Sequence, residues 1–223
     1  MQITRVALFD FCETLVNFQT ADSYVYYVLE KSKSKFSQRW IKFYDFLKKC
    51  KIIFLLEYFS RWRYSINKRM ILMSLKGFKE TELQALACSY YYDRIRPNFI
   101  NTVLGTLKQK KTDGYRVYIV SGGYDIYLKY FVEEFELDGL LSTRIAFKNG
   151  ECLGRFDGKD CLSQQKIKYL NEVLIQKPDY SESYSDSISD LPLLTWTTEG
   201  FVISKYQSQK WALDNKLNEI IWK

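Results

Sequence analysis

Several β-prone runs of the sequence end in polar residues whose types suit phosphoryl transfer. Asp10 follows the run VALF, Ser121 follows YIV, and Asp186 and Asp190 follow YSESYS, while Lys166 lies between the second and third runs. Carboxylates are ligands that Mg²⁺ prefers, and bound Mg²⁺ offsets the repulsion between an anionic nucleophile and a phosphate. Lysine and serine can hold phosphoryl oxygens, and an aspartate can attack phosphorus to form an aspartyl-phosphate. These residue types therefore indicate phosphate chemistry.

The absence of histidine narrows the alternatives. None of the 223 residues is a histidine, so Ser-His-Asp catalysis, Cys-His catalysis and histidine-ligated metals are excluded. The five cysteines are odd in number and show no C-x-x-C spacing, which argues against a zinc site or a disulfide framework. We expect them to pack as small apolar side chains, and the chemistry to depend on carboxylates, lysine, hydroxyls, thiols or a hard metal ion.

The elements that position these residues alternate between strand and helix. Short β-prone runs at 4–9, 116–120, 180–185 and 200–204 are separated by helical stretches at 20–95, 97–111, 124–136, 163–175 and 208–221, with a hairpin at 144–156. This alternation predicts an α/β fold, a Rossmann-like parallel sheet with helices on both faces. Ligands bind outside the carboxyl ends of such strands, so we expect the polar residues to meet there.

The first helical stretch is too long to serve as one crossover between two strands. We therefore predict an inserted all-helical cap domain at residues 17–93, and a catalytic core made of residues 1–16 and 94–223. At 223 residues, the chain suits a core domain with one such insertion.

Four motifs stand in a fixed order along the chain. They are Asp10-Phe11-Cys12-Glu13-Thr14, VYIVSGGY with Ser121, DGKDCLSQQKIKYL with Lys166 (or, as the weaker candidate, Lys159), and YSDSISDLPLL with Asp186 and Asp190. The set resembles the haloacid dehalogenase (HAD) superfamily over residues 4 to about 205, in particular its phosphoserine-phosphatase-like enzymes with a helical cap. The resemblance implies a Mg²⁺-dependent phosphatase, a phosphoric monoester hydrolase that acts on a small phosphorylated metabolite.

The resemblance also implies a role for each motif residue. Asp10 would be the nucleophile, and the backbone carbonyl of Cys12 would join Asp10 and Asp186 around Mg²⁺. Asp190 would support the metal or Lys166, and Lys166 would act on the transferring group. Ser121 and Gly122 would bind the phosphoryl oxygens.

Cys12 departs from the family pattern, which usually has an acid/base aspartate at this position. A thiol is a weak proton donor with an ordinary pKa near 8.5, and losing a general acid/base costs about 10²–10⁴ in rate. Three interpretations stay open. Glu13 or a cap group takes over the proton transfer, or the leaving group needs little help, or the protein is a weak or inactive pseudo-phosphatase that binds a phosphorylated ligand or a membrane surface.

The cap composition bears on the substrate. Phosphoserine phosphatases carry a cap glutamate that holds the substrate amine, whereas the corresponding stretch here has Gln19 and Asp22 and no glutamate. Serine phosphate is therefore disfavoured, and a sugar, polyol or lipid-linked phosphate is favoured. Arg69 stands roughly where relatives place a cap arginine, and we predict that it contacts the substrate.

Residues 31–70 concentrate the positive charge of the chain. They hold twelve Lys or Arg against two acidic residues, a net charge of +10 in a chain of net charge +7, and they are rich in aromatic residues. The segment is either a solvated basic helical face or a surface for an anionic partner, for which we expect an anionic membrane. No nucleic-acid motif is visible. We expect a cytoplasmic location, peripheral at the inner membrane surface in the second case.

Overall fold

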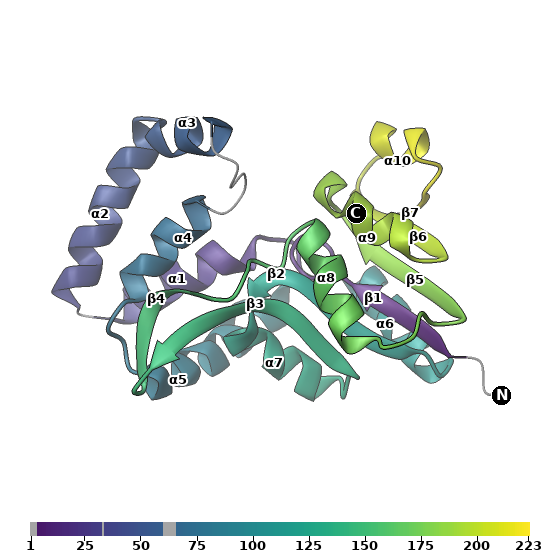
Figure 1. Cartoon of the computed structure of the whole chain (residues 1–223), viewed down its shortest axis with the longest axis horizontal. Helices are drawn as coiled ribbons and strands as arrows, with labels where there is room; N and C mark the ends of the chain where they lie inside the picture. Colours follow the sequence, from purple (N-terminus) through teal and green to yellow (C-terminus); the bar gives the residue numbers. More distant parts are fainter. Residues whose placement is uncertain (1–3, 33, 60–65) are drawn as a thin grey trace.

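A computed structural model of the chain describes residues 4–32, 34–59 and 66–223. Its centre is a seven-stranded sheet with the strand order β4-β3-β2-β1-β5-β6-β7 (Figure 1). The strands are β1 (Arg5–Phe9), β2 (Arg116–Tyr124), β3 (Gly139–Lys148), β4 (Glu151–Asp157), β5 (Tyr180–Ser185), β6 (Glu199–Lys205) and β7 (Asn218–Trp222). Neighbouring strands are parallel, except that β3 and β4 form an antiparallel hairpin. The predicted fold class, a Rossmann-like parallel sheet, is confirmed.

Strand β1 lies in the middle of the sheet, and both of its faces are buried. Four of its five residues are fully buried, and it pairs with β2 on one edge and with β5 on the other. A near-continuous apolar run of this kind is expected of a parallel strand with helices on both sides. Phe9 stacks on Tyr184 of β5 with 4.3 Å between the ring centroids. This packing fixes the strand end from which Asp10 follows.

The core helices are divided between the two faces of the sheet. They are α6 (Asn101–Thr112), α7 (Asp125–Glu134), α8 (Gln164–Val173), α9 (Leu191–Trp196) and α10 (Lys210–Asp214). Alternate residues of a strand point to opposite faces. Accordingly, Ala7 and Phe9 pack in a cluster with residues of α6 and α7, whereas Val6 and Leu8 pack with residues of α8 and α9.

The described residues of the cap form helices joined by turns. The cap comprises α1 (Thr20–Lys31), α2 (Lys35–Lys49), α3 (Ile52–Phe59), α4 (Ile66–Leu72), the 3₁₀ turn η1 (Met73–Leu75) and α5 (Glu80–Tyr90), and a π-helical turn at Tyr91–Ile95 leads back to the core. Figure 1 shows α2 and α3 at the end of the molecule remote from α9 and α10. Hairpin β3–β4 reaches the cap, where Gly154 lies against Met73. The exact domain boundaries stay a prediction.

Two sequence predictions of secondary structure are wrong in detail. The helix predicted at 208–221 ends at Asp214, and Asn218–Trp222 instead forms β7, which pairs in parallel with β6. The β-branched pair Ile220 and Ile221 and the aromatic Trp222 favour a strand, and Ile220 and Trp222 pack against the core. The predicted hairpin strand is also longer, because β3 begins at Gly139 and extends the parallel sheet.

In the part of the chain that the structure describes, no helix combines the length and the apolar character needed to cross a membrane.

Candidate active site

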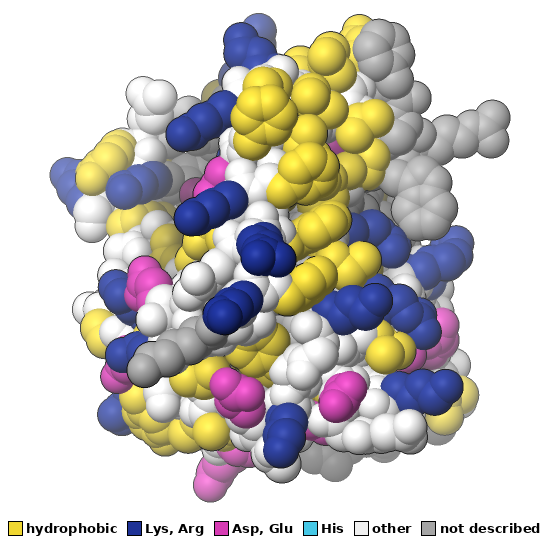
Figure 2. Space-filling view, turned by 90° about the vertical axis from the view of Figure 1, so that its left-hand side faces the viewer, with side chains coloured by type: hydrophobic (Ala, Val, Ile, Leu, Met, Phe, Trp, Pro, Cys, Tyr) yellow, Lys and Arg dark blue, Asp and Glu magenta, His cyan; other side chains and the backbone are white. Residues whose placement is uncertain are grey.

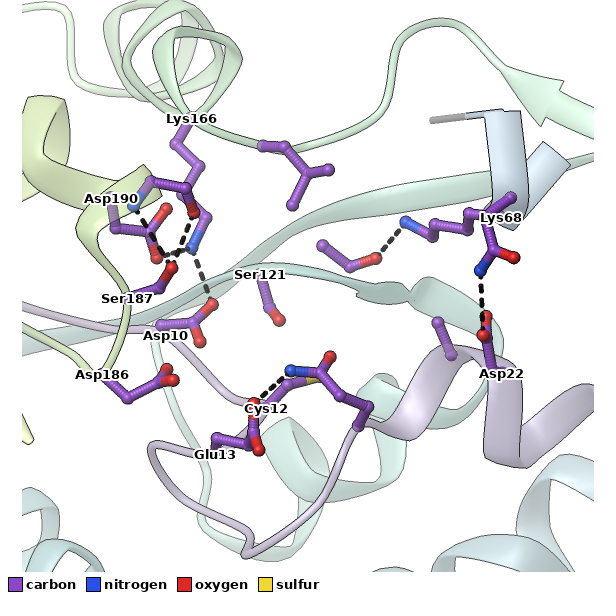
Figure 3. A pocket seen from close by; sticks show the side chains of 16 residues that line it. Asp10, Cys12, Glu13, Asp22, Lys68, Ser121, Lys166, Asp186, Ser187 and Asp190 are labelled. Carbon is purple, nitrogen blue, oxygen red and sulfur yellow. Dashed lines mark hydrogen bonds and ion pairs between the residues drawn. The ribbon is translucent and has the colours of Figure 1, made fainter. Parts of the chain in front are cut away.

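A cavity of about 350 Å³ lies at the carboxyl ends of β1, β2 and β5, where core and cap meet. Asp10, Ser121, Lys166, Asp186 and Asp190 all line it, although they come from distant parts of the sequence (Figure 3). Proteins with open parallel sheets bind ligands in a crevice at this position, and the volume of the cavity suits a small molecule.

Lys166, at the start of α8, holds two of these carboxylates. Its Nζ donates to Oδ1 of Asp10 and to Oδ2 of Asp190, at 2.6 Å each, and its side chain is 1% exposed. Burial alone would lower the pKa of Lys166, but the charges of Asp10 and Asp190 outweigh burial and raise that pKa. Lys166 is therefore a permanent cation that fixes the orientation of Asp10.

Asp10 and Asp186 share the hydroxyl of Thr14. Thr14 Oγ1 lies 3.4 Å from Oδ2 of Asp10 and 3.0 Å from Oδ1 of Asp186, and it accepts the backbone N–H of Asp186 at 3.0 Å. A hydroxyl has one proton, so it cannot donate fully to both carboxylates. Burial, and secondly the charge of Asp10, raise the pKa of Asp186 to about 8. Burial also raises the pKa of Asp10, against the effect of Lys166.

The donor set fits a divalent cation. The carboxylates of Asp10, Asp186 and Asp190 all line the cavity, and Lys166 is bonded to two of them, Asp10 and Asp190. The buried Oδ1 of Asp190 has no hydrogen-bond partner among the described residues. The described residues contain no group of three or more His, Cys, Asp or Glu side chains arranged for one metal ion. Mg²⁺ does not need such a group, because it usually takes one or two carboxylates and completes its shell with waters or carbonyls.

The end of β2 forms the opposite wall of the cavity. Ser121 is fully buried and its Oγ accepts the N–H of Gly123 at 3.1 Å, and the pairing of β2 with β3 shifts register here. A Cβ on Gly122 would lie 2.6 Å from Cδ2 of Leu162. A larger residue here would therefore force the Leu162 side chain, in the loop before α8, to shift.

Cys12 and Glu13 both line the cavity but differ in surroundings. The Cys12 thiol contacts the Thr20 hydroxyl at 3.0 Å, and that hydroxyl contacts Tyr127 at 2.8 Å. Burial, and secondly the charge of Asp10, raise the pKa of the Cys12 thiol to about 11. Glu13 is exposed and has a left-handed backbone with φ of 56°, and its carboxylate accepts the Gln19 amide at 2.5 Å. The left-handed turn, rare outside glycine, brings Glu13 to the same cavity.

Among the described residues of the cap, Lys68 on α4 is the cation that lines the cavity, and Arg69 does not line it. Lys68 Nζ donates to Asp160 at 2.5 Å, to Thr143 Oγ1 at 3.0 Å and to the carbonyl of Gly122. The Arg69 guanidinium instead lies over the Phe156 ring, 4.6 Å from its centroid. The two neighbours differ because consecutive helical residues point about 100° apart.

Sequence reasoning missed Lys68, although the sequence holds a signal. In α4 the buried residues are Lys68, Ile71 and Leu72, the spacing of one helix face. A lysine at the helical spacing of buried apolar residues is a candidate for a buried functional group. Asp22 and Asn67 also line the cavity on the cap side, where Asn67 Nδ2 donates to Asp22 at 3.1 Å. Burial raises the pKa of Asp22.

Comparisons with known proteins agree with this fold and site. A family model described as haloacid dehalogenase-like hydrolase matches residues 7–195. The phosphoserine phosphatase of Methanocaldococcus jannaschii is 26% identical over 170 residues, which make up 76% of this chain and 69% of that protein. Protein CicA of Caulobacter vibrioides is 25% identical over 146 residues, which make up 63% of this chain and 64% of CicA.

Solved structures share the fold at low sequence identity. A protein of unknown function from Bordetella pertussis Tohama I has a TM-score of 0.80 at 18% identity, covering 98% of this chain and 99% of that chain. A phosphoserine phosphatase solved as a phospho-aspartyl intermediate analogue has a TM-score of 0.61 at 18% identity, covering 100% of this chain and 95% of that chain.

The chain belongs to the haloacid dehalogenase-like hydrolases, because the family model spans most of its length. Within that family it is similar in sequence to a phosphoserine phosphatase, in line with the subfamily that its motifs predicted.

Proposed function

We propose that the protein is a Mg²⁺-dependent phosphatase that hydrolyses a small phosphomonoester through an aspartyl-phosphate on Asp10. The observation that carries the proposal is Lys166, which holds Asp10 and Asp190 at 2.6 Å each in a cavity also lined by Asp186 and Ser121. One structural neighbour, a phosphoserine phosphatase, was solved as an analogue of its phospho-aspartyl intermediate, and this supports the covalent route by analogy.

In the first step Asp10 attacks phosphorus. A bond forms between an Asp10 carboxylate oxygen and phosphorus, the ester P–O bond breaks, and the leaving alkoxide takes up a proton. Oδ1 of Asp10 accepts the Lys166 ammonium at 2.6 Å, whereas Oδ2 has only a long 3.4 Å contact with Thr14. We therefore assign the attack to Oδ2. The hydroxyl of Ser121 and the backbone of Gly122 cradle the transferring oxygens.

The residues that would hold Mg²⁺ are Asp10, Asp186 and the backbone carbonyl of Cys12, while Asp190 supports Lys166. Mg²⁺, when bound, neutralises charge on the phosphoryl group and on Asp10.

Glu13 is the carboxyl that we assign to proton transfer. A thiol with a pKa of about 11 is ionised in only about one molecule in 10⁴ at pH 7, so Cys12 is a poor general base. Glu13 lines the same cavity and is open to water, which suits protonation of the alkoxide and later activation of the hydrolytic water. This assignment accounts for turnover without an aspartate at position 12.

The cap side of the cavity suits a hydroxyl-rich leaving group. Lys68 is a donor, Asp22 is an acceptor and Asn67 is both, so adjacent hydroxyls of a sugar or polyol phosphate can each find a partner. We propose this substrate class, or a lipid-linked phosphate with such a headgroup. A cytoplasmic location is part of the proposal, since the five cysteines are unpaired, as is usual in a reducing compartment.

The decisive experiment is phosphate release from a panel of phosphomonoesters, with Mg²⁺ and with EDTA. We expect Mg²⁺-dependent turnover by the unaltered protein, its loss in Asp10→Asn, and its retention in Asp214→Asn, a matched change at an exposed aspartate of α10. Turnover that survives Asp10→Asn would refute the covalent mechanism. A silent protein that gains activity with Cys12→Asp would instead indicate a pseudo-phosphatase that binds a phosphorylated ligand.

A further inference from the structure

The far end of the cap carries an unusual density of exposed apolar side chains. Among the described residues, eight of fifteen exposed large hydrophobic residues lie on α2 and α3 alone. We call them the cap-tip apolar surface: Phe36, Phe43, Phe46, Ile52, Phe54, Leu55, Leu56 and Tyr58. Phe54 and Tyr58 are 65% and 61% exposed. A contiguous patch of this kind marks an interaction site rather than ordinary surface.

These side chains are exposed because the two helices use another face for folding. Tyr44 of α2 and Ile53 of α3 are buried, and Tyr44 donates its hydroxyl proton to Asn67 at 2.6 Å. The buried face of the two helices therefore differs from the cap-tip apolar surface, much of which stays exposed. Figure 2 shows it as a continuous strip, and α2 and α3 lie at the end of the molecule opposite the β5–β7 edge (Figure 1).

Basic side chains flank the strip on both sides (Figure 2). All six Lys and Arg residues described between 34 and 59 are exposed, namely Lys35, Arg39, Lys42, Lys48, Lys49 and Lys51. The two acidic residues there are engaged inward, since Asp45 accepts from the Tyr26 hydroxyl at 3.2 Å and Glu57 accepts from the backbone N–H of Asn67 at 3.0 Å. The outward field is therefore positive. Lys33, Arg61 and Arg63 of the basic segment lie outside the described residues.

We propose that α2 and α3 form a docking surface for an anionic lipid bilayer. Apolar rings with cations on both sides match the interface of such a membrane, where acyl chains lie beneath negatively charged headgroups. A second copy of this chain is a poorer occupant, because two such faces would bring their positive charges together. The proposal does not depend on the proposed phosphatase activity, since it concerns a different face and is tested without substrate.

The test is co-sedimentation of the whole protein with vesicles at low salt. Vesicles of phosphatidylcholine alone are compared with vesicles in which a quarter of the lipid is phosphatidylglycerol. We expect binding to the anionic vesicles that weakens steeply between 50 mM and 300 mM salt, because screening shortens the reach of the charges.

Two sets of variants separate charge from apolar insertion. Changing Lys48, Lys49 and Lys51 to Gln should lower the vesicle partition coefficient about a hundredfold, at about fivefold per charge. The matched control changes Lys148, Lys168 and Lys216, which are exposed lysines outside the cap, and should leave binding unchanged. All six side chains are exposed, so folding is preserved, which far-ultraviolet circular dichroism verifies.

The second set removes apolar contact. The double variant Phe54→Ser with Leu55→Ser should lower binding tenfold or more. The control variant Ile175→Ser with Leu213→Ser should not lower binding, because these residues, 95% and 65% exposed, lie on the surface of the core domain, away from the cap. Absence of binding at low salt would overturn the proposal, as would equal binding to neutral and anionic vesicles. A dimer in sedimentation velocity that Phe54→Ser disrupts would also overturn it, because a second copy would then cover this face.

Discussion

Replacing Lys166 with methionine tests the electrostatic centre of the site. Met has a similar length but no charge, so Lys166→Met leaves Asp10 and Asp190 buried without the cation at 2.6 Å from each. Removing one partner from a buried ion pair costs about 3–5 kcal/mol of unfolding free energy. For a chain of this size, that corresponds to a decrease in melting temperature of about 6–20 °C. Phosphate release should be abolished.

The assay is urea unfolding together with a thermal scan, with Lys168→Met as the matched control. Lys168 is two residues further along α8 and exposed, so its replacement should change the unfolding free energy by less than about 0.5 kcal/mol. Adding Asp10→Asn to Lys166→Met removes one of the two stranded charges. The double variant should therefore recover part of the lost stability, with a coupling of about 1–3 kcal/mol, while staying inactive.

Equal stability of Lys166→Met and Lys168→Met would refute the reasoning, because the buried carboxylates would then not depend on the lysine. Additive effects of Asp10→Asn and Lys166→Met would refute the direct contact between the two side chains.

Four further expectations follow from single residues. Glu13→Gln should lower kcat by about 10²–10⁴ in phosphate release with the fold retained, and unchanged kcat would remove Glu13 from the mechanism. Gly105→Ala, where an added Cβ meets nothing within 4 Å in α6, should raise the unfolding free energy by about 0.5–1 kcal/mol. Gly200→Ala should instead lower it by about 1–3 kcal/mol, because the Cβ would lie 2.5 Å from the Leu194 carbonyl oxygen, and a neutral result would show that this backbone yields. Burial alone would raise the pKa of Glu219, but hydrogen bonds from two serines and one backbone N–H outweigh burial and lower that pKa. The charge of Glu219 therefore stabilises the fold above the unfolded pKa near 4.5, and this contribution is lost as the pH falls through the folded pKa. Glu219→Gln should therefore cost about 0.5–1 kcal/mol at pH 7 and close to nothing near pH 3, measured by urea unfolding at both values.

The sequence predicted those parts of the fold in which an apolar run, typical of a buried strand, is followed directly by a polar residue suited to ligand binding. The run before Asp10 is apolar because β1 is covered on both faces, and the polar residue after it marks the edge where ligands bind. Parallel strands bring their carboxyl ends to one edge, so Ser121 and Asp186 could be expected near Asp10 from the sequence alone.

What sequence reasoning missed depends on contacts between distant segments. The strand at Asn218–Trp222 forms because it can pair with β6 at the sheet edge, which outweighs the helical appearance of 208–221. The helical spacing of α4 indicates that Lys68 is buried, but its position at the cavity depends on the packing of α4 against β4, which the sequence does not show. The resemblance to the family had indicated its neighbour Arg69 instead. Consecutive residues of a helix point in different directions, so the Arg69 side chain lies over Phe156 and not at the cavity.

Lys68 also links the cap to the core through polar contacts. Its ammonium is shared by the Gly122 carbonyl near the end of β2, by Thr143 and by Asp160. A ligand oxygen that recruits this ammonium competes with those three acceptors, so the free energy of binding and the free energy of holding the cap against the core are coupled. Such coupling is reciprocal: if ligand binding at Lys68 weakens the cap contact by a given factor, the cap contact weakens ligand binding by that same factor. Under the proposed function, the affinity for a substrate that recruits Lys68 would therefore depend on the cap contact that the substrate displaces.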